Sequence, residues 1–258
     1  MRKSEEVNDS KSSRPFKTVS RIQLFGIPRY FFALMSQMIL TSGIQYFQPF
    51  LAVRIKMFGY PPNFIALGFL IPSILYILGS NFVYLITQRM PKRFVIITGL
   101  LLLALGEWMI GQSKILDLGT DAEIILIGLS VIGVAACVTT IPILPECLES
   151  TEENQTLDYE AEEVATLTAA SFSTINSMGS FSGPWLSAFL NQFYGFSKAQ
   201  EYYASGIACF ALVYFFLGGG LSIFWRSEIE KEKAAVQTTI DSLQVASNDR
   251  IELIKSQS

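Results

Sequence analysis

Three polar side chains inside one apolar stretch are the strongest candidates for chemistry in this sequence. Gln45, Tyr46 and Gln48 lie in a segment, about 30–53, that is otherwise rich in hydrophobic residues. The step of three residues from Gln45 to Gln48 brings their amides toward the same side of a helix. These groups could present donors and acceptors to a solute, or they could hydrogen-bond to a neighbouring helix for about 0.6–2 kcal/mol each. Both interpretations stay open, and the cavity wall is our prediction.

Glu107 is the ionisable residue that lies well inside an apolar stretch, about 94–112. A polar group in hydrocarbon is costly, so it needs a partner, a cavity or a route to the interface. Because Glu107 is close to the expected outer end of its helix, we expect it to reach the interface beside Trp108, an aromatic anchor. A proton site is the alternative.

Charged residues at one end of the apolar stretches predict a cytoplasmic latch. Glu146 follows Pro142-Ile143-Leu144-Pro145, and Arg89 and Arg93 flank the short turn between two other stretches. We predict that Glu146 pairs with Arg89 or Arg93. Alternatively, Glu146 introduces an expected loop at 147–164, which has seven acidic residues and no basic one.

Small residues dominate the stretch at about 165–190. Gly179 and Gly183 have the Gly-x-x-x-Gly spacing, and Pro184 follows directly. Small residues let helices approach closely, and a proline frees a backbone carbonyl and permits bending. The pattern predicts a tight helix interface, a helix that flexes during transport, or both, because the two roles are compatible.

Long apolar helices are the elements that must position these residues. Half of the 258 residues are hydrophobic and 16% are charged, against about 25% charged in soluble domains; mean hydropathy is +0.39. The stretches 65–86 and 94–111 flank a basic turn, and about 20 helical residues cover about 30 Å, the thickness of a hydrocarbon core. We therefore predict an all-α integral membrane protein.

Six transmembrane spans are predicted within a domain at 27–226. A polar arm at 1–26 precedes it, and the tail at 227–258 is either an amphipathic helix or a solvated segment. With six spans, 15 of the 19 Lys and Arg residues fall on the side of the termini, which predicts that both termini are cytoplasmic. The predicted spans are about 30–53, 65–87, 94–112, 123–144, 165–190 and 202–225.

Several classes of function have no support in the sequence. There is no histidine, and Cys137, Cys147 and Cys209 are isolated, so we expect no metal and no cofactor. No phosphate loop or nucleophile–base pair is present, which argues against an enzyme. The net charge of −3 gives no reason to expect a nucleic-acid partner.

The stretch from Pro28 to Trp225 resembles the C-terminal six-helix half of a major facilitator superfamily (MFS) transporter, and within it the vesicular amine and polyamine transporter-like branch. The residues that carry this resemblance lie in order along the chain: Phe47-Gln48-Pro49-Phe50-Leu51-Ala52, Gly68-Phe69-Leu70, Tyr76, Pro91-Lys92-Arg93, Gly99, Gly111, Ile115-Leu116 and Gly179 to Leu186. The turn after the second span departs from the family, because Leu85-Ile86-Thr87-Gln88-Arg89 lacks the usual Gly and Asp.

The resemblance implies transport of a small organic solute, with a cationic amine exchanged for protons as the specific form. Facilitators bind substrate between two halves near the bilayer midplane, so six helices supply one wall. The implied partners are the lipid bilayer, the solute, and a second six-helix half or a second copy. A truncated or half-size transporter is one interpretation; a non-transporting membrane scaffold subunit of a larger complex is the other.

Overall fold

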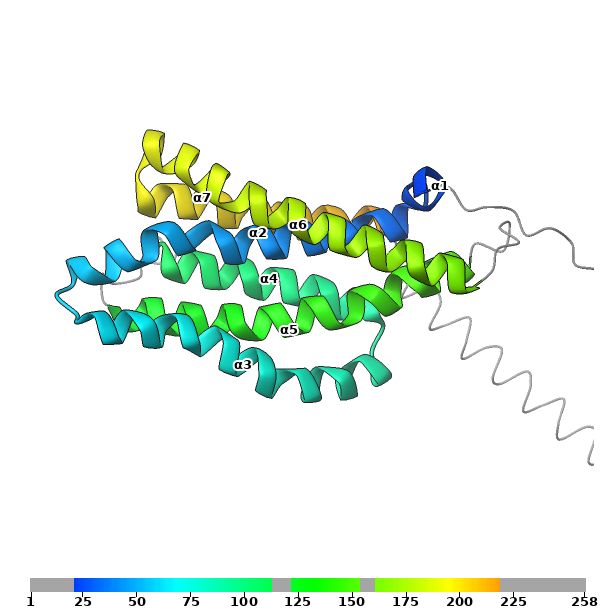
Figure 1. Ribbon diagram of the computed structural model, residues 1–258, viewed down its shortest axis with the longest axis horizontal. Coiled ribbons are helices and arrows are strands. Elements are labelled where there is room, and N and C mark those ends of the chain that lie inside the picture. The colour runs from blue at the N-terminus through cyan, green and yellow to red at the C-terminus, as the bar shows by residue number, and fades with distance from the viewer. Residues whose placement is uncertain (1–20, 113–121, 154–160, 219–258) are drawn as a thin grey trace, which may run out of the picture.

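The computed structural model describes residues 21–112, 122–153 and 161–218, and these ranges are all-α (Figure 1). The predicted arm up to residue 20 and the predicted tail lie outside the described residues. Within the described ranges there are one short helix and six long ones. Their bounds are α1 Arg21–Phe25, α2 Pro28–Met57, α3 Pro62–Arg89, α4 Lys92–Ile110, α5 Ala122–Glu152, α6 Ala161–Tyr194 and α7 Phe196–Leu217.

Each predicted span falls on one of the six long helices, although several ends differ. The α1 turn was not predicted. α5 continues to Glu152, so the expected acidic loop begins as helix, and α7 begins six residues before its predicted start at 202. The prediction of an all-α fold of the membrane type is confirmed. By length and composition, three of the described helices are apolar enough to cross a membrane: Asn63–Arg89, Lys92–Ile110 and Ala122–Glu152.

Proline and glycine mark where the helices begin and turn. Pro28 and Pro62 occupy first-turn positions of α2 and α3, where a missing N–H costs nothing. Gly59 and Gly195 have φ of +80° and +73° in the α2–α3 and α6–α7 turns, a left-handed conformation that glycine adopts without steric penalty.

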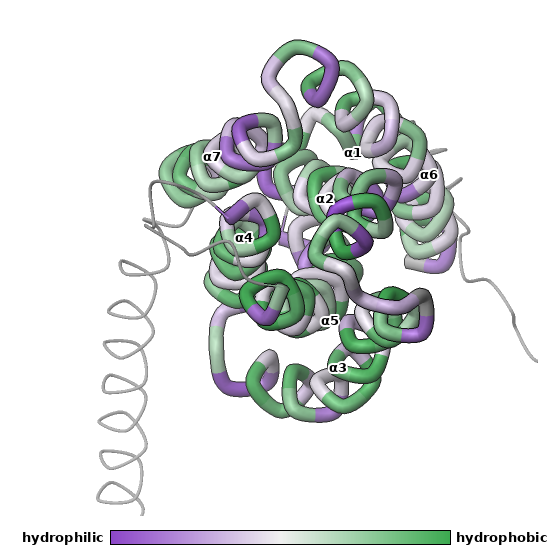
Figure 2. Tube along the Cα trace, turned by 90° about the vertical axis from the view of Figure 1, so that its left-hand side faces the viewer, coloured by the Kyte–Doolittle hydropathy of each residue, from purple (hydrophilic) through white to green (hydrophobic). Residues whose placement is uncertain are grey.

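The long helices run alternately up and down, and α2 and α5 lie at the centre. α4 and α3 pack on α5, α6 packs on α2, and α7 packs chiefly on α4 (Figures 1 and 2). The α2–α3 and α6–α7 turns lie at the same end of the bundle (Figure 1). The opposite end, which we call the ion-pair end, holds the beginnings of α2 and α4 and the end of α5.

Hydrophobic residues occur throughout the helices of the bundle (Figure 2), and many of their side chains are exposed on its outside. α3 is the extreme case: Ile77 and Phe82 are 66% and 68% exposed. On α6, Phe181 and Trp185 are 78% and 64% exposed. Many large apolar side chains exposed on the same helices fit a lipid or protein neighbour better than water.

Candidate functional site

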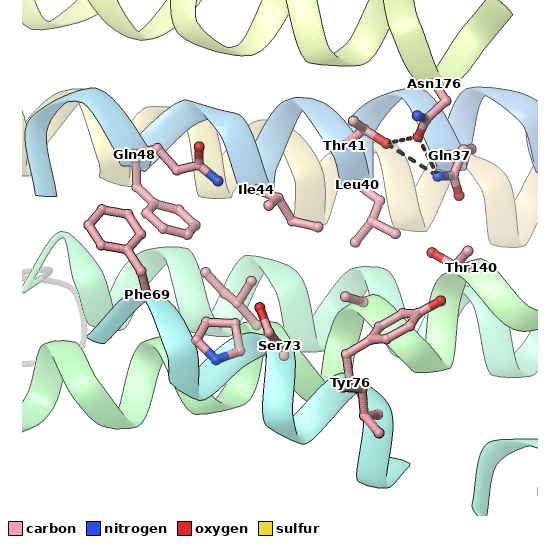
Figure 3. A pocket seen from close by; sticks show the side chains of 16 residues that line it. Gln37, Leu40, Thr41, Ile44, Gln48, Phe69, Ser73, Tyr76, Thr140 and Asn176 are labelled. Atoms are coloured by element: carbon pink, nitrogen blue, oxygen red, sulfur yellow. Dashed lines mark hydrogen bonds between the residues drawn. The ribbon is translucent and has the colours of Figure 1, made fainter. Parts of the chain in front are cut away.

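A cavity of about 480 Å³ lies between α2, α3 and α5, with Asn176 of α6 in its wall (Figure 3). Most of the lining is apolar. No charged side chain is among the described residues that line it. The lining residues whose side chains carry polar atoms are Gln37, Thr41, Gln48, Ser73, Tyr76, Thr140 and Asn176.

A close crossing of α3 and α5 shapes this cavity. A Cβ atom at Gly133 would lie 2.6 Å from the carbonyl oxygen of Pro72, so only glycine permits this approach. Pro72 lies inside α3 and removes one helical hydrogen bond, which favours a bend. Beyond the crossing α3 diverges from α5 (Figure 1), and the cavity occupies space between α3 and α2.

Three side chains form a hydrogen-bonded triad at one end of the cavity (Figure 3). Gln37 Nε2 donates to Thr41 Oγ1 at 3.2 Å and to Asn176 Oδ1 at 3.0 Å. Thr41 Oγ1 donates in turn to Asn176 Oδ1 at 2.7 Å. The triad joins α2 to α6 and fixes the orientation of the Gln37 amide.

Of the three residues predicted to line a cavity, only Gln48 lines this one. The ring of Tyr46 stacks on Tyr203 of α7 at 4.1 Å, and its hydroxyl donates to the carbonyl oxygen of Ala199 at 3.1 Å. Gln45 faces α6, where its Cβ packs close to Gly183. Each helical residue turns by about 100°, so neighbours in sequence face different helices.

Gln37 and Thr41 were missed, although a signal for them exists. The positions 37, 41 and 48 are separated by four and seven residues, which places them in one stripe along α2. A search for this spacing, in place of the adjacent pair at 45 and 46, would have found the cavity face. Asn176 has no such signal in the sequence.

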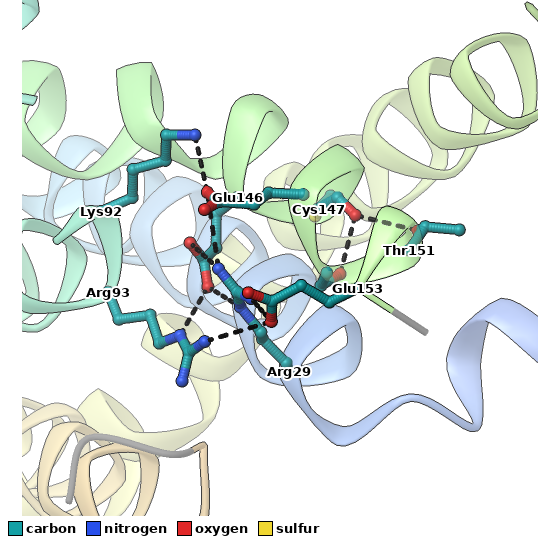
Figure 4. A network of polar contacts seen from close by, with 9 residues as sticks. Arg29, Lys92, Arg93, Glu146, Cys147, Thr151 and Glu153 are labelled. Carbon is teal, nitrogen blue, oxygen red and sulfur yellow. Dashed lines mark hydrogen bonds and ion pairs between the residues drawn. The ribbon is translucent and has the colours of Figure 1, made fainter. Parts of the chain in front are cut away.

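An ion-pair cluster joins α2, α4 and α5 at the ion-pair end (Figure 4). Glu146, 1% exposed, accepts from Arg29 Nε at 2.5 Å, from Arg29 Nη2 at 3.0 Å and from Arg93 Nε at 3.0 Å. Lys92 Nζ pairs with Glu149 Oε2 at 2.7 Å, and Arg29 also contacts Glu153. Three cations therefore meet three carboxylates.

The helix dipoles explain why these charges need partners from other helices. Arg29 and Arg93 lie in the first turns of α2 and α4, and Glu149 lies in the last turn of α5. Each sign is unfavourable beside its own helix terminus. Burial alone would lower the pKa of Arg29, but its hydrogen bond and charge interaction with Glu146 raise that pKa above its ordinary value.

The predicted pairing of Glu146 with Arg93 is present in the structure, whereas the pairing with Arg89 is not. Arg89 is exposed, and no ion pair to Arg89 occurs among the described parts of the chain. Arg29 was missed because it was assigned to the N-terminal region, although it directly follows the helix-starting Pro28. Whether the cluster gates a path stays a prediction.

The small-residue stretch of α6 packs tightly on α2. A Cβ atom at Gly179 would lie 2.6 Å from the carbonyl oxygen of Met38, and one at Gly183 would collide with the carbonyl oxygen of Ser42. α6 continues as helix through Pro184. The close contact agrees with the predicted interface, and the flexing role of these residues is untested.

Glu107 does not reach an interface, which corrects the sequence interpretation. Its side chain is 0% exposed, and Gln200 Nε2 of α7 donates to its Oε2. The other oxygen, Oε1, has no hydrogen-bond partner among the described residues. The tight packing of α7 on α4 covers the carboxyl, and nothing in the sequence of α4 alone could reveal that cover.

These features define a class: a multi-pass, all-α membrane protein with a cavity inside the bundle and an ion-paired cluster at one end. Comparison with known proteins agrees with this class. No protein-family model matches the chain. The human MFS-type transporter SLC18B1 is 27% identical over 206 residues, which cover 78% of this chain and 43% of the human protein.

Rodent proteins of the same name show the same distant similarity. The rat protein is 28% identical over 165 residues, or 62% of this chain and 35% of the relative, and the mouse protein is 27% identical over 165 residues. The chain thus spans less than half the length of these relatives. All three relatives are named MFS-type transporters, and the similarity leaves open which half of them the chain corresponds to.

Proposed function

We propose that this chain is a six-helix half of an MFS-type transporter and supplies one wall of the path of a small organic solute. The cavity between α2, α3 and α5 carries this proposal. It combines an apolar lining with a few oriented polar groups, the usual composition of a small-molecule site. The distant similarity to MFS-type transporters over 206 residues supports the same function.

The ion-pair cluster is proposed as a latch on the cytoplasmic side, with Glu146 and Arg93 as its centre and Arg29 as an additional member. Gly179, Gly183 and Pro184 are proposed to let α6 move against α2. Buried, multiply paired charges resist separation, so opening at this end requires that the cluster exchange its partners.

For the solute we propose a cationic amine that is exchanged for protons. The rings of Phe69 and Tyr76 in the cavity wall support this choice, because aromatic faces attract ammonium groups. Glu107 is the proposed proton site, since a fully buried carboxyl is much cheaper to keep neutral than charged.

A second six-helix half, on another chain or another copy of this one, is proposed to complete the cavity. The exposed apolar side chains of α3 and α6 support such a neighbour. The first experiment is to purify the native particle in mild detergent and to measure its mass and composition. A homodimer, or a complex with a second six-helix protein, is the expected result.

The companion experiment is amine uptake by that particle in proteoliposomes. We expect Gln48→Ala to reduce uptake several-fold, while Gln45→Ala, which lies outside the cavity, changes it little. A particle in which this chain belongs to a large unrelated assembly, together with no uptake, would favour the scaffold function instead.

A further inference from the structure

The triad in the cavity leaves one strong acceptor unpaired. Gln37 is 4% exposed, and its Oε1 has no hydrogen-bond partner among the described residues. Leaving a buried acceptor unpaired costs about 1–3 kcal/mol. A buried polar atom without a partner that faces a cavity is therefore a candidate contact for a ligand.

Hydrogen bonds to Thr41 and Asn176 orient the side-chain amide of Gln37. Its nitrogen donates to both Thr41 Oγ1 and Asn176 Oδ1. The Thr41 hydroxyl uses its own proton on Asn176 Oδ1, so it can offer Gln37 only an acceptor. With Asn176 in this orientation, a flip of Gln37 alone would set its oxygen against Asn176 Oδ1. In this arrangement Oε1 lies on the cavity side, where Figure 3 shows it facing Thr140 and Tyr76.

The rest of the cavity restricts the kind of ligand that this acceptor can bind. Leu40 and Ile44 provide an apolar surface next to the triad, and Phe69 lies at the other end of the cavity, near Gln48 (Figure 3). No charged side chain of either sign is among the described lining residues, so a carboxylate, a phosphate or an ammonium ion would be buried there without a counter-charge, at high cost. The unpaired oxygen of Gln37 needs a ligand group that donates an N–H or O–H hydrogen bond.

We propose that Gln37 Oε1 is the specificity-determining acceptor of this cavity and binds the N–H or O–H donor of an amphipathic solute. The apolar part of the solute lies against Leu40 and Ile44. This inference rests on the proposed function for the cavity, and it names the polar end of the solute. Alcohols and amines both carry such a donor.

Four matched probes test the proposal on the full chain in lipid nanodiscs. They are 2-phenylethanol, its methyl ether, 2-phenylethylamine and 3-phenylpropanoate, with affinities measured by ligand-observed NMR after subtraction of empty nanodiscs. We expect the alcohol to bind about tenfold more tightly than the ether, because the ether has no proton for Gln37. The carboxylate should bind most weakly.

Two substitutions and one control locate the effect. Gln37→Met should bring the alcohol-to-ether ratio to about one, whereas Gln45→Ala, on the same helix but outside the cavity, should leave it unchanged. Gln37→Glu keeps an acceptor and adds a charge, so it should strengthen amine binding more than alcohol binding. A purely structural Gln37 would instead shift all probes together when it is replaced.

Equal binding of the alcohol and the ether by the unsubstituted chain, or binding of none of the four probes, would overturn the assignment. These ratios do not depend on transport. A preserved ratio in a particle without uptake would refute the proposed function alone, and uptake without a ratio would refute this inference alone.

Discussion

The ion-pair end and the cavity both place polar side chains among apolar helices, but they differ in how those side chains are satisfied. At the ion-pair end, Glu146 is 1% exposed and is contacted by two arginines from two other helices. In the cavity, Gln37 is almost as buried, yet its oxygen has no partner among the described residues. The first arrangement holds helices together, and the second leaves room for a ligand.

Burial alone therefore does not identify a binding site. Removing one partner from a buried group of ion pairs is strongly destabilising, because the remaining charges stay buried without a counter-charge. A buried acceptor that has no hydrogen-bond partner already carries a desolvation cost. Substitutions in the two regions should therefore separate stability from binding.

The largest effect is expected at the centre of the ion-pair cluster. Glu146→Ala leaves Arg29 and Arg93, each 12% exposed, without their shared carboxylate. Loss of one partner from a buried pair costs about 3–5 kcal/mol, which corresponds to a decrease in melting temperature of about 10 °C for a chain of this size. Thermal unfolding in detergent measures it. Glu162→Ala, at an exposed residue of α6, is the matched control; equal melting temperatures for both variants would contradict the structural role of the cluster.

An intermediate effect is expected where α6 meets α2 beside the triad. In Gly179→Ala, the new methyl group would lie 2.6 Å from the Met38 carbonyl oxygen and 3.0 Å from Thr41 Cβ. Overpacking of this kind costs about 1–3 kcal/mol, and it should also separate Asn176 from Gln37 and weaken probe binding.

Gly206→Ala provides the comparison for that experiment. Gly206 is also inside a helix, but a Cβ atom there would meet nothing within 4 Å, so alanine should be neutral or stabilising by about 0.5–1 kcal/mol. Both variants are compared by thermal unfolding. Similar effects of the two substitutions would show that the α2–α6 contact is looser than described.

The smallest effect is expected at the rim of the ion-pair cluster. Lys92 and Glu149 lie 2.7 Å apart, but their side chains are 29% and 42% exposed. Exposed pairs contribute about 0–1 kcal/mol, and salt screens them. A double-mutant cycle with Lys92→Ala and Glu149→Ala should give a coupling energy in this range that decreases at high salt. A large, salt-independent coupling would mean that the rim is as buried as the centre.

Much of the fold follows from the sequence because hydrophobic length is a local property. The apolar stretches, the helix-starting prolines Pro28 and Pro62, and the basic turn before Arg93 are visible without a structure. Two charges of the ion-pair cluster were visible too, because Glu146 and Arg93 are expected at the same end of a bundle whose helices alternate in direction. The partner Arg29 was within reach of the same reasoning.

Which side of each helix faces which neighbour was decided only by the tertiary structure. Glu107 is buried because α7 packs on α4 and brings Gln200 to it, and Tyr46 faces Tyr203 for the same kind of reason. Asn176 of α6, which completes the triad, lies 139 residues after Gln37 in the chain. The amino-acid sequence is enough to place the apolar helices and the charges at their ends, because hydrophobic length and charge are local properties. The helix orientations that form a cavity with an unpaired acceptor depend on contacts between distant segments, so they follow only from packing of the whole bundle.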